Sequence, residues 1–234
     1  MKKMLKVAAV LAAILMALTL GACSDGDDGG SGSGGGSGKP QSETFKKFDV
    51  PENGVYYVNK DGEISAEKKD GYVFKVRIYE NEFGYSCSLE EYTGSESSVS
   101  IPEGVTYIEF KVFDGCEKLT SVILPKGINS ITGKAFNECT ALTTVEFKGV
   151  IVDGDYGYIG YGAFYDCDKL VTVKYAGTKE QWKSIRSEND QYIGGSIFYS
   201  SPNEDYHGQR VTVECKDGKL KSGGYNGELF EDAD

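Results

Sequence analysis

The sequence predicts a β-rich solenoid made of stacked coils, because two apolar patterns recur in phase along the chain. A valine followed two residues later by an apolar residue occurs five times, with steps of 23, 23, 28 and 38 residues. These pairs are Val99/Ile101, Val122/Leu124, Val145/Phe147, Val173/Tyr175 and Val211/Val213. An isoleucine five residues before a phenylalanine recurs in the same phase, at Ile108/Phe113, Ile131/Phe136, Ile159/Phe164 and Ile193/Phe198.

Each coil of about 23 residues is expected to hold a short strand, a turn, a second extended piece and one helical turn around Ala–Phe. The apolar members of the pattern would point inward, as in Leu119, Val122 and Leu124. A single coil cannot bury such a face alone. Stacked coils can, with strands about 4.8 Å apart in a parallel ladder, so the repeat itself accounts for the core.

The chain before and after the coils is expected to close the two ends of the stack. Residues 44–92 predict a small β-meander that caps the N-terminal end, because Asp61-Gly62 and Asp70-Gly71 separate short β-rich runs. The solenoid is assigned to residues 93–215, and its last strand, Val211–Cys215, would be the C-terminal cap. Residues 216–234 are Gly-rich and end acidic, which predicts a frayed tail.

The first residues have the layout of an export signal. A basic start is followed by fourteen uncharged residues from Val7 to Leu20, too few for a permanent membrane span. The run Leu20-Gly21-Ala22-Cys23 resembles the lipobox of bacterial lipoproteins. That resemblance implies cleavage of residues 1–22 and lipidation of Cys23, after which residues 23–43, mostly Gly, Ser and Asp, would form a flexible linker.

The repeat motifs point to one family. The runs Ile101-Pro-Glu-Gly-Val-Thr-Tyr-Ile108, Leu119-Thr-Ser-Val-Ile-Leu-Pro125 and Lys134-Ala-Phe-Asn-Glu-Cys139 resemble the BspA-like leucine-rich-repeat family of bacterial surface lipoproteins. Tyr175-Ala-Gly-Thr-Lys-Glu-Gln-Trp182 resembles the degenerate last repeat of that family. The resemblance implies a leucine-rich-repeat solenoid, an α/β right-handed superhelix that is rich in strands and has short helical turns. It also implies a function in attachment, because members of that family are adhesins and surface antigens that bind host proteins or other cells.

Composition excludes several classes of function. The formal charge of the 234-residue chain is 25 minus 36, or −11, which disfavours binding driven by nucleic-acid phosphates. His207 is the one histidine in the sequence, which makes a histidine-based catalytic triad improbable and leaves too few histidines for a multi-histidine metal site. Neither a cofactor, a metal nor an enzymatic activity is therefore expected. The cysteines Cys116, Cys139 and Cys167 share one repeat position, which predicts buried thiols rather than disulfides.

Two sets of residues are candidates for ligand contact. The outward strand face would carry Ser100, Ile123, Glu146, Lys174 and Thr212. On leucine-rich solenoids this face is commonly the surface that binds a ligand. The insertion in the third coil adds Tyr156, Tyr158 and Tyr161, whose rings suit recognition of protein or sugar but equally suit packing of the coil edge.

The predicted function is that of a non-catalytic, lipid-anchored surface protein of a bacterial envelope, exposed on the outer membrane. Its expected partners are host or bacterial surface proteins or glycans, and it would reach the membrane only through the lipid. The alternative that stays open is a glycan- or small-ligand-binding module of the envelope.

Overall fold

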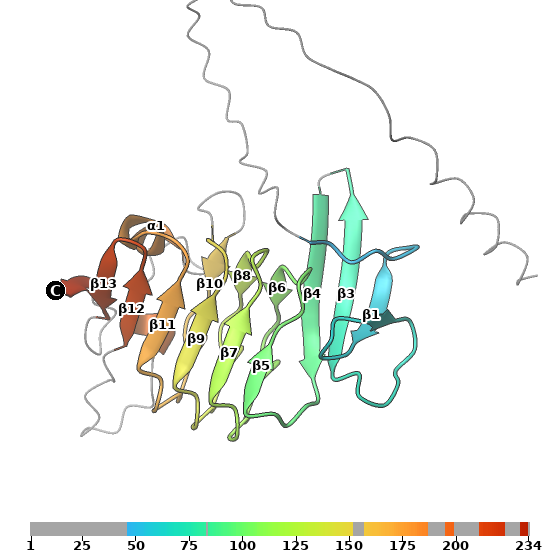
Figure 1. Ribbon diagram of the computed structural model, residues 1–234, viewed down its shortest axis with the longest axis horizontal. Coiled ribbons are helices and arrows are strands. Elements are labelled where there is room, and N and C mark those ends of the chain that lie inside the picture. Colours follow the sequence, from blue (N-terminus) through green and yellow to red (C-terminus); the bar gives the residue numbers. More distant parts are fainter. Residues whose placement is uncertain are drawn as a thin grey trace, which may run out of the picture. The chain divides into compact units, whose positions relative to one another are not determined.

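The computed structural model describes residues 46–82, 84–151, 157–186, 195–198, 211–222 and 230–233, all within one compact unit, Ser42–Asp234 (Figure 1). In chain order, the strands and helices are β1 (Gly54–Val58), β2 (Ile64–Ser65), β3 (Phe74–Asn81), β4 (Gly84–Tyr92), β5 (Ser98–Ser100), β6 (Tyr107–Ile108), β7 (Ser121–Leu124), β8 (Ser130–Ile131), β9 (Thr144–Phe147), β10 (Tyr158–Ile159), β11 (Thr172–Tyr175), α1 (Lys179–Ser184), the 3₁₀ helix η1 (Gly195–Phe198), β12 (Thr212–Cys215), β13 (Gly218–Lys221) and β14 (Glu231–Ala233). They form two sheets: sheet A, in the order β10-β8-β6-β4-β3-β1-β2, and sheet B, in the order β14-β13-β12-β11-β9-β7-β5.

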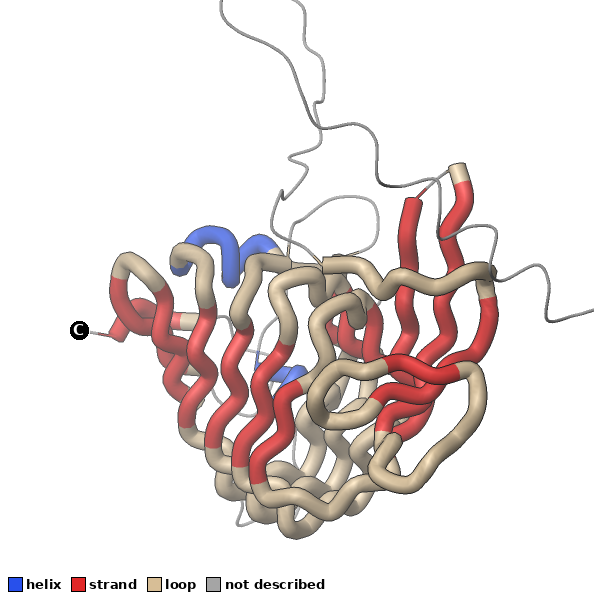
Figure 2. The backbone as a smooth tube through the Cα atoms, turned by 45° about the vertical axis from the view of Figure 1, so that its right-hand side comes forward, coloured by secondary structure: helices blue, strands red, loops and turns tan. Residues whose placement is uncertain are grey.

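The predicted stacking of 23-residue coils is confirmed, because equivalent residues pair in two parallel ladders. In sheet B, Val122 pairs with Val99 on one side and with Val145 on the other. In sheet A, Ile131 lies between Ile108 and Ile159. Each of the first three coils therefore contributes one strand to each sheet, and Figure 2 shows the strands of sheet B side by side. One repeat of the sequence therefore corresponds to one step along each parallel ladder.

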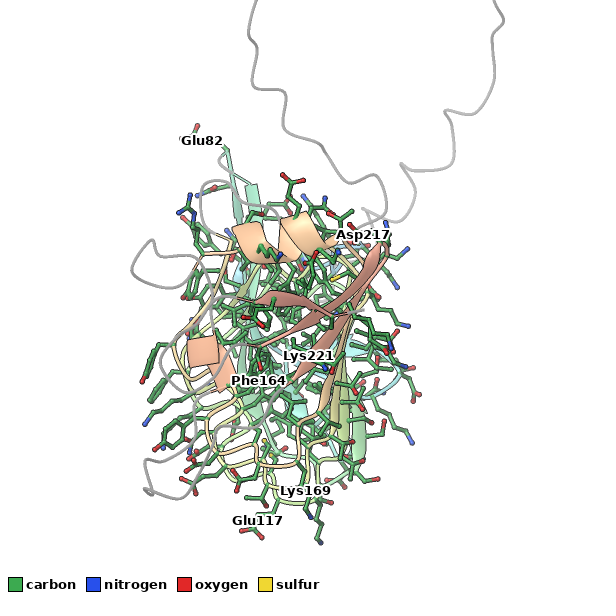
Figure 3. All side chains as sticks on the ribbon, turned by 90° about the vertical axis from the view of Figure 1, so that its left-hand side faces the viewer. Glu82, Glu117, Phe164, Lys169, Asp217 and Lys221 are labelled. Carbon is green, nitrogen blue, oxygen red and sulfur yellow. The ribbon has the colours of Figure 1, made fainter. Side chains whose placement is uncertain are left out.

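The core is built from the inward side chains of both ladders, closed by a column of aromatic rings. Phe113 and Phe136 stack with centroids 4.7 Å apart and planes at 6°, and Phe136 stacks on Phe164 at 5.1 Å and 12°. Phe164 continues to Phe198 at 5.7 Å, and Figure 3 shows Phe164 inside the body of the protein. The four phenylalanines of the predicted Ile-x-x-x-x-Phe pattern therefore lie in one column.

The segments around Ala–Phe are hydrogen-bonded turns, so the predicted single helical turn is wrong. The amide of Asn137 donates to the carbonyl of Lys134, and that of Cys116 donates to the carbonyl of Phe113. An α-helix needs consecutive residues near φ −60°, whereas Lys134 has φ 57° and Glu138 has φ 57°. A left-handed residue every fourth position interrupts the helix. Within the described residues, α1 and η1 are the helices.

The N-terminal strands form an antiparallel sheet that continues directly into the coils. β1 lies between β2 and β3, while β4 pairs antiparallel with β3 and parallel with β6. Asp61-Gly62 sits in the turn that joins the paired strands β1 and β2, as predicted, and Gly62 has φ +83°. Asp70-Gly71 also forms a turn, but its flanking strands β2 and β3 do not pair, because β1 separates them.

The C-terminal strand has a different register from the predicted one. Val213, not Val211, pairs with Val173, so the fifth repeat pair is Val213/Cys215. Both assignments satisfy the alternation of a strand, since a shift of two residues leaves the inward side unchanged. The prediction that residues 216–234 fray is also wrong where the chain is described. β13 and β14 extend sheet B antiparallel beyond β12.

The cysteines form a ladder of thiols, and all five in the described part of the chain are free. The thiol of Cys139 donates to the carbonyl of Phe113 at 3.1 Å, and that of Cys167 donates to the carbonyl of Phe136 at 3.0 Å. Both are buried, which confirms the prediction for these two coils. Cys116 is only half-buried, so the prediction of a buried thiol is wrong for the first coil.

We expect the thiols of Cys87, Cys116 and Cys215 to react slowly in the folded protein. Burial raises the pKa of Cys87 to about 12, and burial followed by Asp217 raises that of Cys215 to about 11. A hydrogen bond with Cys139, followed by burial, raises the pKa of Cys116. Since the thiolate is the reactive form, alkylation near pH 8 should be at least about a hundredfold slower than that of a free thiol. The measurement is alkylation of a Cys23→Ser chain with and without denaturant. Fast alkylation of Cys87, Cys116 or Cys215 in the native protein would contradict the prediction.

Candidate functional site

The outward side chains of β5, β7, β9, β11 and β12 form two rows, because these strands pair in register across sheet B. One row, here the hydroxyl row, consists of Ser98, Ser121, Thr144, Thr172 and Thr212. The other, here the charged row, consists of Ser100, Ile123, Glu146, Lys174 and Glu214. Together they are the ladder face.

The ladder face places four of the five predicted outward residues in one row and corrects the fifth. Ser100, Ile123, Glu146 and Lys174 occupy this row, as expected. The predicted fifth member, Thr212, instead pairs with Thr172, and Glu214 takes its place beside Lys174. The cause is the same two-residue shift in register that moves Val213 opposite Val173. Glu214 was therefore a functional candidate that the sequence reasoning missed.

The hydroxyl row offers groups that can both donate and accept hydrogen bonds. Ser121 and Ser98 are joined through their hydroxyls at 2.8 Å, and Thr144, Thr172 and Thr212 are partly exposed. The neighbouring threonines at the strand starts serve the fold instead. The Thr120 hydroxyl donates to the carbonyl of Ser97, and the Thr143 hydroxyl donates to that of Thr120.

The charged row alternates in sign. Glu146 pairs with Lys148 at 2.6 Å, and Glu214 pairs with Lys219 at 2.9 Å. Lys174 is exposed between these two acids and has no ion pair with a described carboxylate. Because exposed ion pairs stabilise a fold by at most about 1 kcal/mol, these charges contribute little to folding. They are better suited to choosing a partner by complementary charge.

Of the predicted tyrosines, Tyr158 lies on sheet A and not on the ladder face of sheet B. Tyr158 is on β10 of sheet A, where its ring meets Tyr107 edge-on, with centroids 6.1 Å apart. The two hydroxyls are hydrogen-bonded to each other. Tyr161 follows in the next turn and is 49% exposed. Tyr156 and the lipidation candidate Cys23 lie outside the described residues.

Phe110 is an exposed aromatic residue that the sequence reasoning did not single out. It is 59% exposed and lies in the first coil at the position that Tyr161 takes in the third. The equivalent residue of the second coil is Gly133. The sequence carries a signal for this set, since all three residues stand two places after the inward isoleucines Ile108, Ile131 and Ile159.

A depression of about 270 Å³ lies beside the first coil, and its groups are poorly suited to catalysis. It is lined in part by Tyr92, Glu96 and Cys116. Burial raises the pKa of Tyr92, while a hydrogen bond from Tyr92 lowers that of Glu96. The pKa of the Cys116 thiol is raised, whereas a nucleophilic thiol needs a lowered one.

The described ranges contain neither a cluster of metal-ligating side chains nor a helix able to span a membrane. Across those ranges, histidine, cysteine and acidic side chains nowhere gather in threes as they would around a metal ion. Among the described residues, no helix combines the length and apolar character needed to cross a bilayer.

Stacked strand–turn coils with a Leu-x-x-Val core pattern and a polar ladder outside define a leucine-rich-repeat protein. Residues 77–206 match the model of the BspA type leucine rich repeat region in six copies. Because this match spans more than half of the 234 residues, the chain belongs to that family.

Three solved structures are similar to the chain at low identity. A leucine-rich repeat protein from Bacteroides capillosus is 20% identical, with 61% of this chain and 94% of that chain covered and a TM-score of 0.40. A leucine rich cell surface protein from Faecalibacterium prausnitzii is 19% identical, with 71% and 48% covered and a TM-score of 0.34. The T. pallidum leucine rich repeat protein is 18% identical, with 52% and 81% covered and a TM-score of 0.28. No curated protein matches.

Proposed function

We propose that this protein is a lipid-anchored, non-catalytic surface protein that binds macromolecules of a host or partner cell through its ladder face. The observation that carries the proposal is the pair of outward rows, in which hydroxyls and alternating charges repeat with the coil spacing. Membership of the BspA type family supports it, since leucine-rich-repeat solenoids present extended binding surfaces. The partner is expected to be a protein with a complementary pattern of charge.

The proposed anchor rests on the sequence of the first residues. Cleavage before Cys23 would remove Lys2, Lys3 and Lys6 and no acid, which leaves 22 basic and 36 acidic residues, a charge of −14. Such a charge opposes attraction to anionic lipids, so membrane attachment would depend on the lipid at Cys23. The stretch from Ser24 to Thr44 would give a flexible reach of roughly 25 Å. This reach would hold the repeats away from the outer membrane.

Display on the cell surface can be tested by protease treatment of intact cells. We expect the wild-type protein to be degraded, whereas a Cys23→Ser variant should leave the membrane fraction and escape this treatment. A periplasmic control protein must survive in the same cells, so that lysis is not mistaken for exposure. Survival of the wild-type protein under treatment that removes a known surface protein would contradict the proposal.

Binding through the ladder face can be tested by charge reversal at Lys174. The full chain would first be screened against a panel of purified extracellular-matrix proteins. For a partner found there, Lys174→Glu should weaken binding about tenfold, equivalent to about 1.4 kcal/mol, because it places three acids in one row. Lys169→Glu is the matched control, since this exposed lysine lies where the coils turn (Figure 3). Equal losses in both variants would contradict a specific role for the ladder face.

A further inference from the structure

The two sheets end differently at the N-terminal end of the stack. Sheet A continues beyond the first coil through β4, β3, β1 and β2, whereas β5 is the last strand of sheet B. Figure 1 shows β5 as the final arrow in the row of strands that forms sheet B. At the other end of the stack, β13 and β14 continue sheet B beyond the coils. One side of β5 therefore pairs with no described strand, and we call this side the open edge.

The open edge presents backbone groups that a further strand could use. In a parallel ladder, alternate residues direct both their amide and their carbonyl toward the same neighbouring strand. The amide of Ile101 donates to the carbonyl of Ile123 at 2.9 Å, so Ile101 and Val99 face β7. Ser98 and Ser100 direct their amides and carbonyls the other way, where no described residue forms a hydrogen bond with these groups. Unpaired backbone groups are costly to bury, so they are expected to meet water or a ligand.

The depression of about 270 Å³ lies where the chain enters β5. It is lined on one side by residues of the segment from Tyr92 to Glu96 and on the other by residues 115–119 of the first coil. A strand advances about 3.3 Å per residue, so a chain paired with Ser98 stands beside Glu96 two residues further on. An extended segment on the open edge would therefore bring one side chain to the depression.

The carboxylate of Glu96 is held at the depression in one orientation. The Tyr92 hydroxyl donates to its Oε2 at 2.5 Å, and the Ser95 amide donates to the same oxygen at 3.0 Å. The Tyr92 ring is itself packed between Phe74 and Phe113, with centroids 5.3 and 4.9 Å away. The hydrogen bond from Tyr92 lowers the pKa of Glu96, so this carboxylate is charged at neutral pH. Its Oε1 has no hydrogen-bond partner among the described residues and can accept from a ligand.

The other residues that line the depression favour a basic side chain. Leu119 is 1% exposed and gives an apolar wall along which the methylene stem of arginine or lysine can lie. Glu117 adds a second exposed carboxylate, against one exposed ammonium from Lys118. Lys60 favours the charged form of Glu96 but forms no ion pair with it. This excess of acid, in a chain of formal charge −11, is complementary to a cationic partner.

We propose that the open edge and the depression together bind an extended basic segment of a partner protein. The backbone of the segment would add a strand to sheet B beside β5, and one arginine or lysine side chain would enter the depression and pair with Glu96. Backbone hydrogen bonds would supply affinity, and the depression would supply specificity. This inference goes beyond binding at the ladder face, because it uses the edge of sheet B and a cavity instead of the outward rows.

Fluorescence anisotropy of the full chain with labelled hexapeptides tests the proposal. The peptides alternate threonine and valine and carry an arginine at the first or the last position, so that both strand directions are covered. We expect one arginine peptide to bind, and its counterparts with norleucine or glutamate in place of arginine to bind about tenfold more weakly. Two further versions are N-methylated on the alternate amides of one side or of the other. One of the two should bind and the other should not, because a single side of an added strand faces β5.

Two pairs of variants test the two parts of the site. Glu96→Gln should weaken the arginine peptide about tenfold and leave the norleucine peptide unchanged. Its matched control is Glu180→Gln, since Glu180 is exposed on α1, which follows the third coil. Ser100→Pro should abolish binding, because it removes an amide of the open edge and leaves the pairing with β7 in place. Ser100→Ala keeps that amide and should bind as the wild type does, and circular dichroism checks that both variants fold.

Several outcomes would overturn the proposal. These are no binding of any peptide in the millimolar range, equal binding of the two N-methylated peptides, or equal losses in Glu96→Gln and Glu180→Gln. The N-methylated peptides keep the test decisive even where Ser100→Pro fails to fold. A wild-type dimer in sedimentation that Ser100→Pro dissociates would assign the open edge to a second copy of the chain instead. Lys174→Glu separates the two proposals, because it should impair the ladder face and leave peptide binding intact.

Discussion

Replacement of Phe136 by alanine is expected to lower the free energy of unfolding by about 3–5 kcal/mol, the range for a fully buried phenylalanine. Phe136 is 0% exposed and stacks on both Phe113 and Phe164. The truncation removes two ring contacts, each worth about 0.5–1.5 kcal/mol beyond burial, and leaves a cavity between three coils. The rings cannot close this gap without breaking the ladder hydrogen bonds that hold the coils at their spacing. Denaturant unfolding followed by circular dichroism measures the loss.

The central position of Phe136 in the stack predicts a larger loss of stability than at the end of the stack. In a stacked repeat, stability is close to a sum of coil and interface contributions, so a central coil loses two interfaces and a terminal one loses fewer. Phe198→Ala should therefore cost less than Phe136→Ala, because Phe198 stacks on Phe164 alone, meets Phe230 only edge-on at 6.3 Å and is 9% exposed. Phe110→Ala is the control, since its side chain is 59% exposed and should change stability by less than about 0.5 kcal/mol. Similar losses at Phe110 and Phe136 would refute a structural role for the column.

The stacking itself was predictable because each coil repeats the same inward residues at the same spacing. Val99, Val122 and Val145 predict a strand every 23 residues, and a parallel ladder is the arrangement that buries these valines together. The phenylalanine column followed from the same logic. Since Phe113, Phe136 and Phe164 occupy one repeat position, stacked coils must bring their rings together.

Register and turn conformation were less predictable, because local pattern leaves them open. Alternation cannot distinguish Val211 from Val213 as the partner of Val173, since both point inward. In the second coil the left-handed residues are Lys134 and Glu138, which do not warn against a helix, whereas Gly115 and Gly162 hold equivalent positions in the first and third coils. Tertiary pairing decides both.

The C-terminal strands depend on contacts that only the fold creates. β14 pairs with β13, and Asp232 on β14 accepts hydrogen bonds from Lys179 and Lys183 of α1. These two lysines hold the pKa of Asp232 below its ordinary value. The partners are about fifty residues apart in the chain, so the acidic composition of the tail predicts exposure and not a strand.

The sequence predicts which residues are candidates for ligand contact, but not which of them lie together in the folded protein. Lys174 and Tyr161 belong to different sheets, and the sequence gives no distance between them. Tyr158 contacts Tyr107 only because the coil between them carries the small Ser130 at that position. Pairings of this kind need the register of three coils at once. Tyr107, Ser130 and Tyr158 share one repeat position, so a comparison of equivalent positions in the three coils would have predicted this pair.

Replacement of Gly149 by alanine is expected to cost about 1–3 kcal/mol, although it adds one methyl group only. A Cβ atom at Gly149 would lie 2.1 Å from the carbonyl oxygen of Lys126 in the preceding coil and 2.8 Å from its carbonyl carbon. Both are backbone atoms, so no side-chain rotation relieves the clash. The amide of Lys148 donates to the carbonyl of Leu124 at 3.1 Å and holds the two coils at this separation.

The coils would therefore have to move apart at this point, and the loss should appear as a lower denaturant midpoint for Gly149→Ala. Gly54→Ala is the matched control, because a Cβ atom there meets only the Tyr56 ring at 3.7 Å, an ordinary contact. That substitution should change stability by less than about 0.5 kcal/mol. Because backbone contact between coils is the condition for parallel stacking, equal stability of the two variants would mean that the second and third coils are not packed at this distance.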